Sequence, residues 1–89
     1  MNAAELITFC TLKGDVNLHE RLKDNHNQLT DFYHIRMWFN DDIISFQYHK
    51  DENDELTFIK GRINIRKGRL GISSEEIHGF KHLEETLTK

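Results

Sequence analysis

The sequence has no proline, one cysteine and no long hydrophobic run. With Cys10 as the only cysteine, the chain can form neither an internal disulfide bond nor a cysteine-based zinc site. A small domain without disulfide bonds fits a reducing compartment. Every apolar run is far shorter than a membrane span, and residues 1–5 lack the basic region of a signal peptide. We therefore expect a cytoplasmic protein with no membrane contact.

Positive charge is also scarce relative to negative charge. Lys and Arg number 12 and Asp and Glu number 15, so the formal net charge is -3. This balance gives no general attraction to nucleic acid or to an anionic membrane. Hydrophobic residues make up 37% of the chain and charged residues 30%. Because the apolar positions are periodic, we predict one folded domain, residues 1–89, with a modest core.

Catalytic motifs are missing as well. The sequence has no phosphate-binding loop, dinucleotide-binding glycine pattern, Ser-His-Asp arrangement or zinc-finger spacing. Its aromatic and basic residues do not match the signature of the RNA-recognition motif. These absences favour a protein that is not an enzyme and needs no cofactor.

What the sequence does contain, between residues 32 and 73, is the alternating pattern of an antiparallel meander. A two-residue turn at Asp41-Asp42 would pair Ile35 with Tyr48, Met37 with Phe46 and Phe39 with Ile44. A second turn at Lys67-Gly68 would pair Ile63 with Ile72 and Ile65 with Leu70. The apolar parity changes after Phe58, so we expect a bulge or bend near Lys60-Gly61. The predicted strands cover residues 31–39, 43–50 and 69–72, and another begins near residue 56.

Three helices are expected around this sheet. Asn2 and Glu5 have the spacing of a capping box before a helix at residues 3–12, although residues 5–12 would also suit a strand. Gly14 would end this helix in the left-handed conformation. The stripe of Leu18, Leu22 and Leu29 predicts a second helix at residues 18–27. Ser73 and Glu76 form another capping box, which predicts the last helix.

The predicted fold class is therefore α+β, with the element order α-α-β-β-β-β-α. A four-stranded antiparallel meander carries two N-terminal helices and one C-terminal helix on its apolar face. That face is expected to hold Tyr33, Ile35, Met37, Phe39, Ile44, Phe46, Tyr48, Leu56 and Phe58.

The other face of the predicted sheet carries a candidate binding surface. Trp38 is the only tryptophan, and its parity places it opposite the core. An outward Trp beside Arg and Ile side chains has the composition of a binding hot spot. If a helix covers this face too, Trp38 belongs to the core instead. The candidate partner-binding residues are His34, Arg36, Trp38, Ile43, Gln47 and His49.

A second candidate surface is a basic patch made of Lys60, Arg62, Arg66, Lys67 and Arg69, a stretch without acidic residues. Cations on a projecting hairpin are well placed to meet phosphates or an acidic protein surface. The alternative is an edge hairpin that its charges keep soluble and unpaired.

Six histidines raise the question of metal binding and of catalysis. His78 and His82 are four residues apart on the predicted last helix, a spacing that lets two imidazoles share a metal ion. No other residues supply matching ligands, so we predict no tight zinc binding. His34 and His49 are directly opposed in the predicted register and could act in acid-base catalysis, or could be an exposed cross-strand pair.

The first functional hypothesis is a small protein-binding module that regulates or inhibits a partner protein. A phage or mobile-element origin would suit the size, although composition cannot show it. The alternatives are a nucleic-acid-binding protein that uses the basic hairpin at residues 60–69 with Trp38 as a stacking group, and a small His-dependent hydrolase. Whether the basic hairpin and Trp38 share one face discriminates the first two. An edge strand could also pair with a second copy of the chain.

Overall fold

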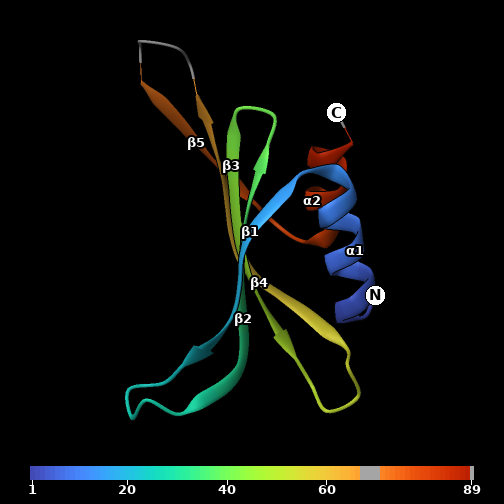
Figure 1. Ribbon diagram of the computed structural model, residues 1–89, viewed down its shortest axis with the longest axis vertical. Coiled ribbons are helices and arrows are strands. Elements are labelled where there is room, and N and C mark those ends of the chain that lie inside the picture. The colour runs from blue at the N-terminus through green and yellow to red at the C-terminus, as the bar shows by residue number, and fades with distance from the viewer. Residues whose placement is uncertain (67–70, 89) are drawn as a thin grey trace.

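The computed structural model describes residues 1–66 and 71–88. Its elements, in chain order, are α1 (Ala3–Lys13), β1 (Asp15–Lys23), β2 (Leu29–Phe39), β3 (Asp42–Lys50), β4 (Leu56–Arg66), β5 (Ile72–Ile77) and α2 (Phe80–Leu87). The strands form one antiparallel sheet in the order β1-β2-β3-β4-β5 (Figure 1). The α+β class is as predicted, but the sheet has five strands and the described helices number two.

The first helix, α1, agrees with the sequence prediction. The Asn2 side chain accepts a hydrogen bond from the Glu5 backbone N–H at 2.8 Å, which satisfies one of the free donors of the first turn. Leu6 and Cys10 are fully buried on its inner side. Gly14 ends the helix by donating its N–H to the Cys10 carbonyl, but its backbone is extended and not left-handed as predicted.

The predicted helix at residues 18–27 is wrong, because residues 15–23 form strand β1 and pair with β2. Register shifts between Val16 and Leu18 and between Arg21 and Lys23 interrupt the alternation of the strand. These bulges give the leucines a spacing that imitates a helix. Residues 24–28 are the hairpin turn, in which an Asp24 carboxylate oxygen accepts the N–H groups of His26 and Gln28.

The β2–β3 turn lies at Asn40-Asp41 and not at Asp41-Asp42 as predicted. The ladder pairs Phe39 with Asp42, so the predicted register is wrong by two residues. Asn40 has φ 57, a left-handed conformation that Asn adopts more readily than most residues. Because side chains alternate with period two, a shift by two residues leaves every side chain on its predicted face.

The predicted change of parity in β4 is confirmed. Gln47 pairs with Lys60 and Tyr48 pairs with Phe58, so Ile59 is the extra residue of a bulge. The bulge lies next to the predicted Lys60-Gly61 position. It allows both halves of β4 to present apolar residues to the same side.

The last strand, β5, replaces the predicted start of the last helix. Ser73 pairs with Ile65 and Glu75 with Ile63, so the predicted pairing of Ile63 with Ile72 is wrong, as is that of Ile65 with Leu70. Six residue pairs with β4 outweigh the local capping preference of this segment. The predicted Lys67-Gly68 turn lies outside the described residues.

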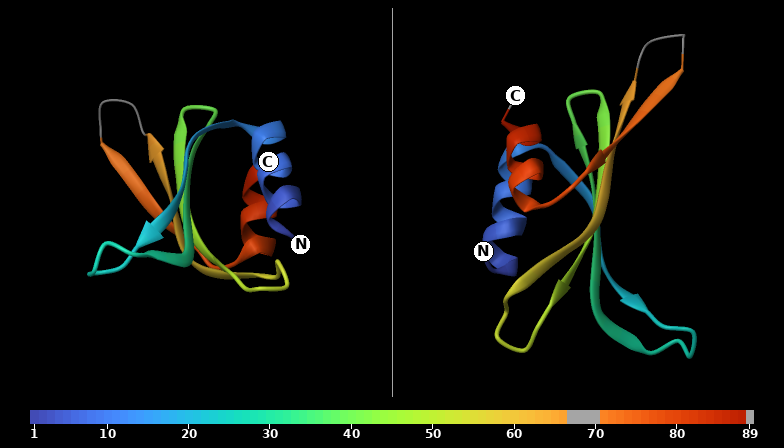
Figure 2. Two further views of the ribbon diagram at one scale, coloured as in Figure 1. Left: turned by 60° about the horizontal axis from the view of Figure 1, so that its bottom comes forward. Right: turned by 180° about the vertical axis from the view of Figure 1, so that it is seen from behind.

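Both helices lie side by side over the same face of the sheet (Figure 2). The residues predicted for the apolar face are all in the core or packed against it, as the sequence predicted. The fully buried set is Leu6, Cys10, Ile35, Met37, Ile44, Phe46, Tyr48, Ile77, Leu83 and Leu87. Neither described helix lies over the opposite face of the sheet, which we call the open face.

Candidate functional site: the open face of the sheet

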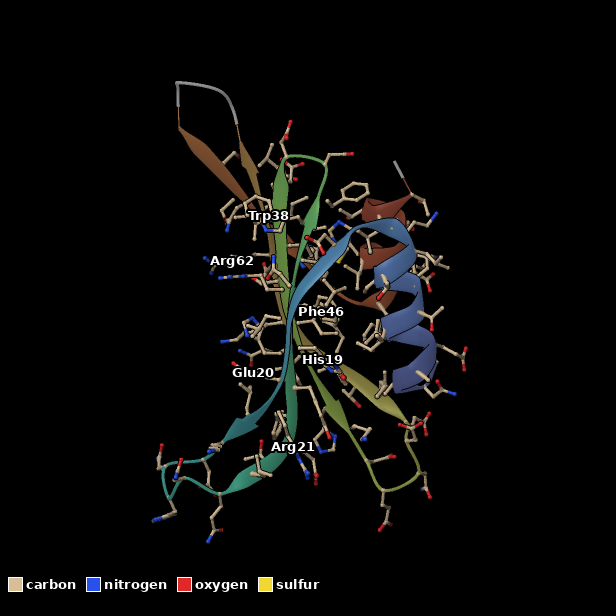
Figure 3. The ribbon with its side chains drawn as sticks, in the orientation of Figure 1. His19, Glu20, Arg21, Trp38, Phe46 and Arg62 are labelled. Carbon is tan, nitrogen blue, oxygen red and sulfur yellow. The ribbon has the colours of Figure 1, made fainter. Side chains whose placement is uncertain are left out.

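The open face is built by cross-strand neighbours, because directly paired residues of an antiparallel ladder point to the same side. Three rows of side chains cross the sheet. They are Asp15, Trp38, Ile43, Asn64 and Ser74; Leu18, Arg36, Ser45, Arg62 and Glu76; and Glu20, His34, Gln47 and Lys60. Figure 3 shows Trp38, Arg62 and Glu20 on the side of the sheet away from the helices.

Trp38 is the main apolar group of this face. Its side chain is 41% exposed, so the alternative in which Trp38 belongs to the core is wrong. The half-buried Ile43 is its cross-strand neighbour. Phe32, at the other end of β2, is 40% exposed and packs against the His49 ring with centroids 5.0 Å apart. The open face therefore offers aromatic area at two separate points.

The charges of the open face are sorted by strand. The cations lie on inner strands, with Arg36 on β2 and Lys60 and Arg62 on β4. The carboxylates lie on the edge strands, with Asp15 and Glu20 on β1 and Glu76 on β5. Arg36 Nε donates to the Asn17 side-chain oxygen at 3.1 Å. Among the described residues, neither Lys60 nor Arg62 has a carboxylate within 4.0 Å. The face thus has a cationic centre between acidic edges.

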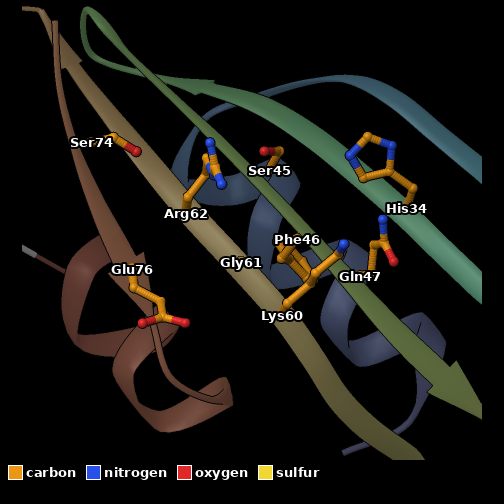
Figure 4. Close-up of a pocket in the computed structure, with 9 residues that line it drawn as sticks. All are labelled: His34, Ser45, Phe46, Gln47, Lys60, Gly61, Arg62, Ser74 and Glu76. Carbon is orange, nitrogen blue, oxygen red and sulfur yellow. The ribbon is translucent and has the colours of Figure 1, made fainter.

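A groove of about 490 Å³ runs over this centre (Figure 4). It is lined by His34, Ser45, Phe46, Gln47, Lys60, Gly61, Arg62, Ser74 and Glu76. In Figure 4, Arg62 and Glu76 extend in different directions although their backbones are paired. On the outer side of the groove, Glu76 has a carboxylate oxygen 3.9 Å from His78. The lining is mostly polar and combines two cations, two hydroxyl groups, one amide and one imidazole with the Glu76 carboxylate at its outer side.

All six predicted partner-binding residues lie on this face. The predicted opposition of His34 and His49 is wrong, because His34 pairs with Gln47 and His49 pairs with Phe32. The shifted turn at Asn40 is the reason. Without a close imidazole pair, the acid-base proposal for these histidines loses the geometry on which it depended.

The basic patch is described only in part. Lys60 and Arg62 lie on the same face as Trp38, which is the arrangement that the nucleic-acid hypothesis requires. The Arg66 side chain and the residues Lys67 and Arg69 lie outside what the structure describes. The basic character of the open face therefore rests on Arg36, Lys60 and Arg62.

The predicted helices at both ends of the sheet hid four residues of this face, which are Leu18 and Glu20 on β1 and Ser74 and Glu76 on β5. A signal for β1 was present in the turn that follows it. Residues 24–28 and 51–55 both begin with an Asp whose carboxylate accepts two backbone N–H groups, and both have a fourth residue with positive φ. The sequence signal that the two turns share is Asp in first place and Asn or Asp in fourth.

The remaining titratable groups of note lie on the helix side. Tyr48 is buried, and burial raises its pKa to about 12. Its hydroxyl lies 2.8 Å from Nε2 of His19, whose pKa is lowered by partial desolvation of the ring and by the nearby Lys50 charge. A neutral imidazole and a neutral phenol therefore share this hydrogen bond, and the tautomer of His19 decides which of them donates. Burial also raises the pKa of Cys10 to about 11, so this cysteine stays a thiol at neutral pH.

His78 does not lie on the last helix as predicted, but its ring still stacks on that of His82, with centroids 5.3 Å apart. His78 precedes α2, and its backbone N–H donates to Nδ1 of His82 at 3.0 Å. Nδ1 of His82 thus accepts a hydrogen bond from the backbone just before the first turn of α2. Within residues 1–66 and 71–88, no three His, Cys, Asp or Glu side chains are grouped to hold a metal ion.

Comparisons of the chain with protein-family models, with curated proteins and with solved structures found no match. None of the helices in the described part of the chain is long and apolar enough to span a bilayer.

Proposed function

We propose that this chain is a small binding module that docks another protein on the open face of its sheet and regulates that partner by occupying its surface. The observation that carries the proposal is Trp38, which is 41% exposed on a sheet face that neither described helix covers. Large exposed aromatic groups are costly in water and are typical anchors of protein interfaces. Ile43 beside it and the surrounding charges supply a rim.

The charge pattern also favours a protein partner over a polyanion. Three described cations on the open face, Arg36, Lys60 and Arg62, are matched by three carboxylates on its edge strands. A nucleic acid that crossed the face would bring its phosphates close to these carboxylates. A protein surface can instead present both signs of charge in the complementary arrangement.

Nucleic-acid binding is the second candidate, and one observation favours it. Lys60 and Arg62 share the open face with Trp38 and have no carboxylate partner among the described residues. Cations beside an exposed aromatic ring are the usual means of holding a single strand by phosphate contacts and base stacking. This candidate requires that the affinity depend steeply on salt.

The test compares wild-type protein with Trp38→Ala and Leu12→Ala variants as immobilised baits. Leu12 is the matched control, because it is 79% exposed but lies on α1, on the helix side. Bound proteins from lysate with and without nuclease treatment are identified by mass spectrometry, and the affinity of the purified partner is then measured by calorimetry. We expect Trp38→Ala to weaken binding by about 2 kcal/mol or more.

Leu12→Ala should leave that affinity unchanged. If Leu12→Ala weakens binding and Trp38→Ala does not, the docking surface is α1 and the proposal is wrong. If the captured material disappears on nuclease treatment, the nucleic-acid candidate replaces it.

A further inference from the structure

Two cations of the open-face groove, Lys60 and Arg62, form no ion pair with a described carboxylate. Lys60 and Arg62 are two residues apart on β4, so both side chains point to the open face. The cross-strand neighbour of Arg62 on the outer side is Glu76, yet no carboxylate oxygen of a described residue lies within 4.0 Å of either cation. Uncompensated cations inside a concave surface attract an anion.

Neutral hydrogen-bonding groups surround these cations. Ser45 is the cross-strand neighbour of Arg62 on β3, Gln47 is that of Lys60, and Ser74 lines the same groove from β5. A guanidinium group can hold a carboxylate through two parallel N–H bonds, and hydroxyl groups can donate to its remaining lone pairs. The groove therefore contains a donor set that fits a planar carboxylate.

We infer that the groove receives a carboxylate side chain, from Asp or Glu in an acidic stretch of the partner protein, which pairs with Arg62 and Lys60. The inference rests on the proposed docking function and names the chemistry of the partner. Trp38 and Ile43 lie in the adjacent row of the sheet. The partner segment thus combines an acidic group with an apolar side chain about one row away.

The edges of the face define what flanks this acidic group. Arg36 and Arg62 are two strands apart, about 10 Å, and mark the width of the cationic centre. Glu20 on β1 and Glu76 on β5 lie beyond it on either side. A segment with an acidic centre and basic flanks matches this order, whereas a chain with a phosphate on every nucleotide does not.

The groove can be tested without the partner by using short peptides as probes. Hexaglutamate is titrated to about 10 mM into isotopically labelled full-length protein at physiological salt, and backbone amide shifts are followed by NMR. We expect shifts concentrated at Ser45, Lys60, Arg62 and Ser74. Hexalysine should instead shift the amides of Glu20 and Glu76 and not these four. An oligothymidylate should bind no more tightly than hexaglutamate.

Arg62→Glu should weaken hexaglutamate binding by about tenfold or more. Lys81→Glu is the matched control, since it makes the same change of charge at an exposed position on α2. Arg62→Gln keeps a polar side chain and should also weaken binding, so the test does not depend on one variant. The amide spectrum of each variant reports whether it remains folded.

Equal weakening by Arg62→Glu and Lys81→Glu, or no shifts at the groove, would overturn the inference. Tighter binding of the oligothymidylate with shifts at Trp38 would overturn it in favour of nucleic acid. The peptide titration measures binding at the groove alone, whereas the Trp38→Ala comparison measures the affinity of a whole partner protein. Failure of one experiment is therefore distinguishable from failure of the other.

Discussion

Removal of the Phe46 ring tests whether the two faces of the sheet differ as described. Phe46 is 1% exposed and packs against Phe58, with ring centroids 6.0 Å apart. Its cross-strand neighbour is Gly61, where even an added Cβ would lie 2.8 Å from the Phe46 Cβ. The surrounding backbone is thus already in close contact and cannot collapse far into a cavity. We expect Phe46→Ala to cost about 3–5 kcal/mol.

That loss is large for a chain of this length, whose whole stability is about 4–13 kcal/mol at the usual value per residue. Urea denaturation measures it directly. With a slope of about 1 kcal/mol per molar, the midpoint should fall by about 3–5 M. Phe46→Leu leaves a smaller cavity, should cost about 1–2 kcal/mol, and keeps the measurement within range if the alanine variant is largely unfolded.

Ser45→Ala is the matched control on the neighbouring residue. Ser45 points to the open face and its hydroxyl makes no hydrogen bond to another described residue. Its removal should cost less than about 0.5 kcal/mol. Equal losses for Ser45→Ala and Phe46→Ala would mean that the open face is covered, which would refute the reasoning.

Three further predictions concern His19, Asn40 and Gly61. The His19 pKa is lowered from 6.5, so the unfolded chain binds this proton more tightly than the folded chain does. The stability difference between wild type and His19→Gln should therefore be largest above pH 6.5 and should shrink as the pH falls through the lowered pKa. A difference that does not depend on pH would contradict this. Asn40→Ala should cost about 1 kcal/mol in urea denaturation because φ is 57, whereas Asn40→Gly should be nearly neutral; equal costs would argue against the turn. Gly61→Ala should cost about 1–3 kcal/mol by the same assay, since its Cβ would crowd Phe46 and Phe58, and a neutral result would contradict the close approach.

The face to which each side chain of the central strands points was predictable, because side chains alternate with period two and an error of two residues in register leaves them on the same face. The β2–β3 turn was misplaced by one residue, at Asn40-Asp41 instead of Asp41-Asp42, and the register therefore moved by two. Trp38, Arg36 and Gln47 were still assigned to the correct face. Individual cross-strand partners depend on the exact turn residues, so the predicted His34–His49 pair was wrong.

The edge strands were not predictable from local pattern. In β1, bulges near Val16 and Arg21 break the alternation, so Leu18 and Leu22 imitate a helical stripe. In β5, the Ser73 to Glu76 spacing satisfies a helix cap locally, but pairing with β4 decides the structure. Because Glu20 and Glu76 lie on these strands, the acidic edges of the candidate site could not be seen from the sequence.

The central claim is that a partner protein covers Trp38 on the open face, and tryptophan fluorescence tests it most directly because Trp38 is the only tryptophan. In the free protein, an indole that is 41% exposed should be readily quenched by acrylamide. A tryptophan-free partner, or one with its tryptophans substituted, should shift the emission to shorter wavelength and reduce quenching as it binds. Unchanged emission and quenching at saturating partner would contradict the account.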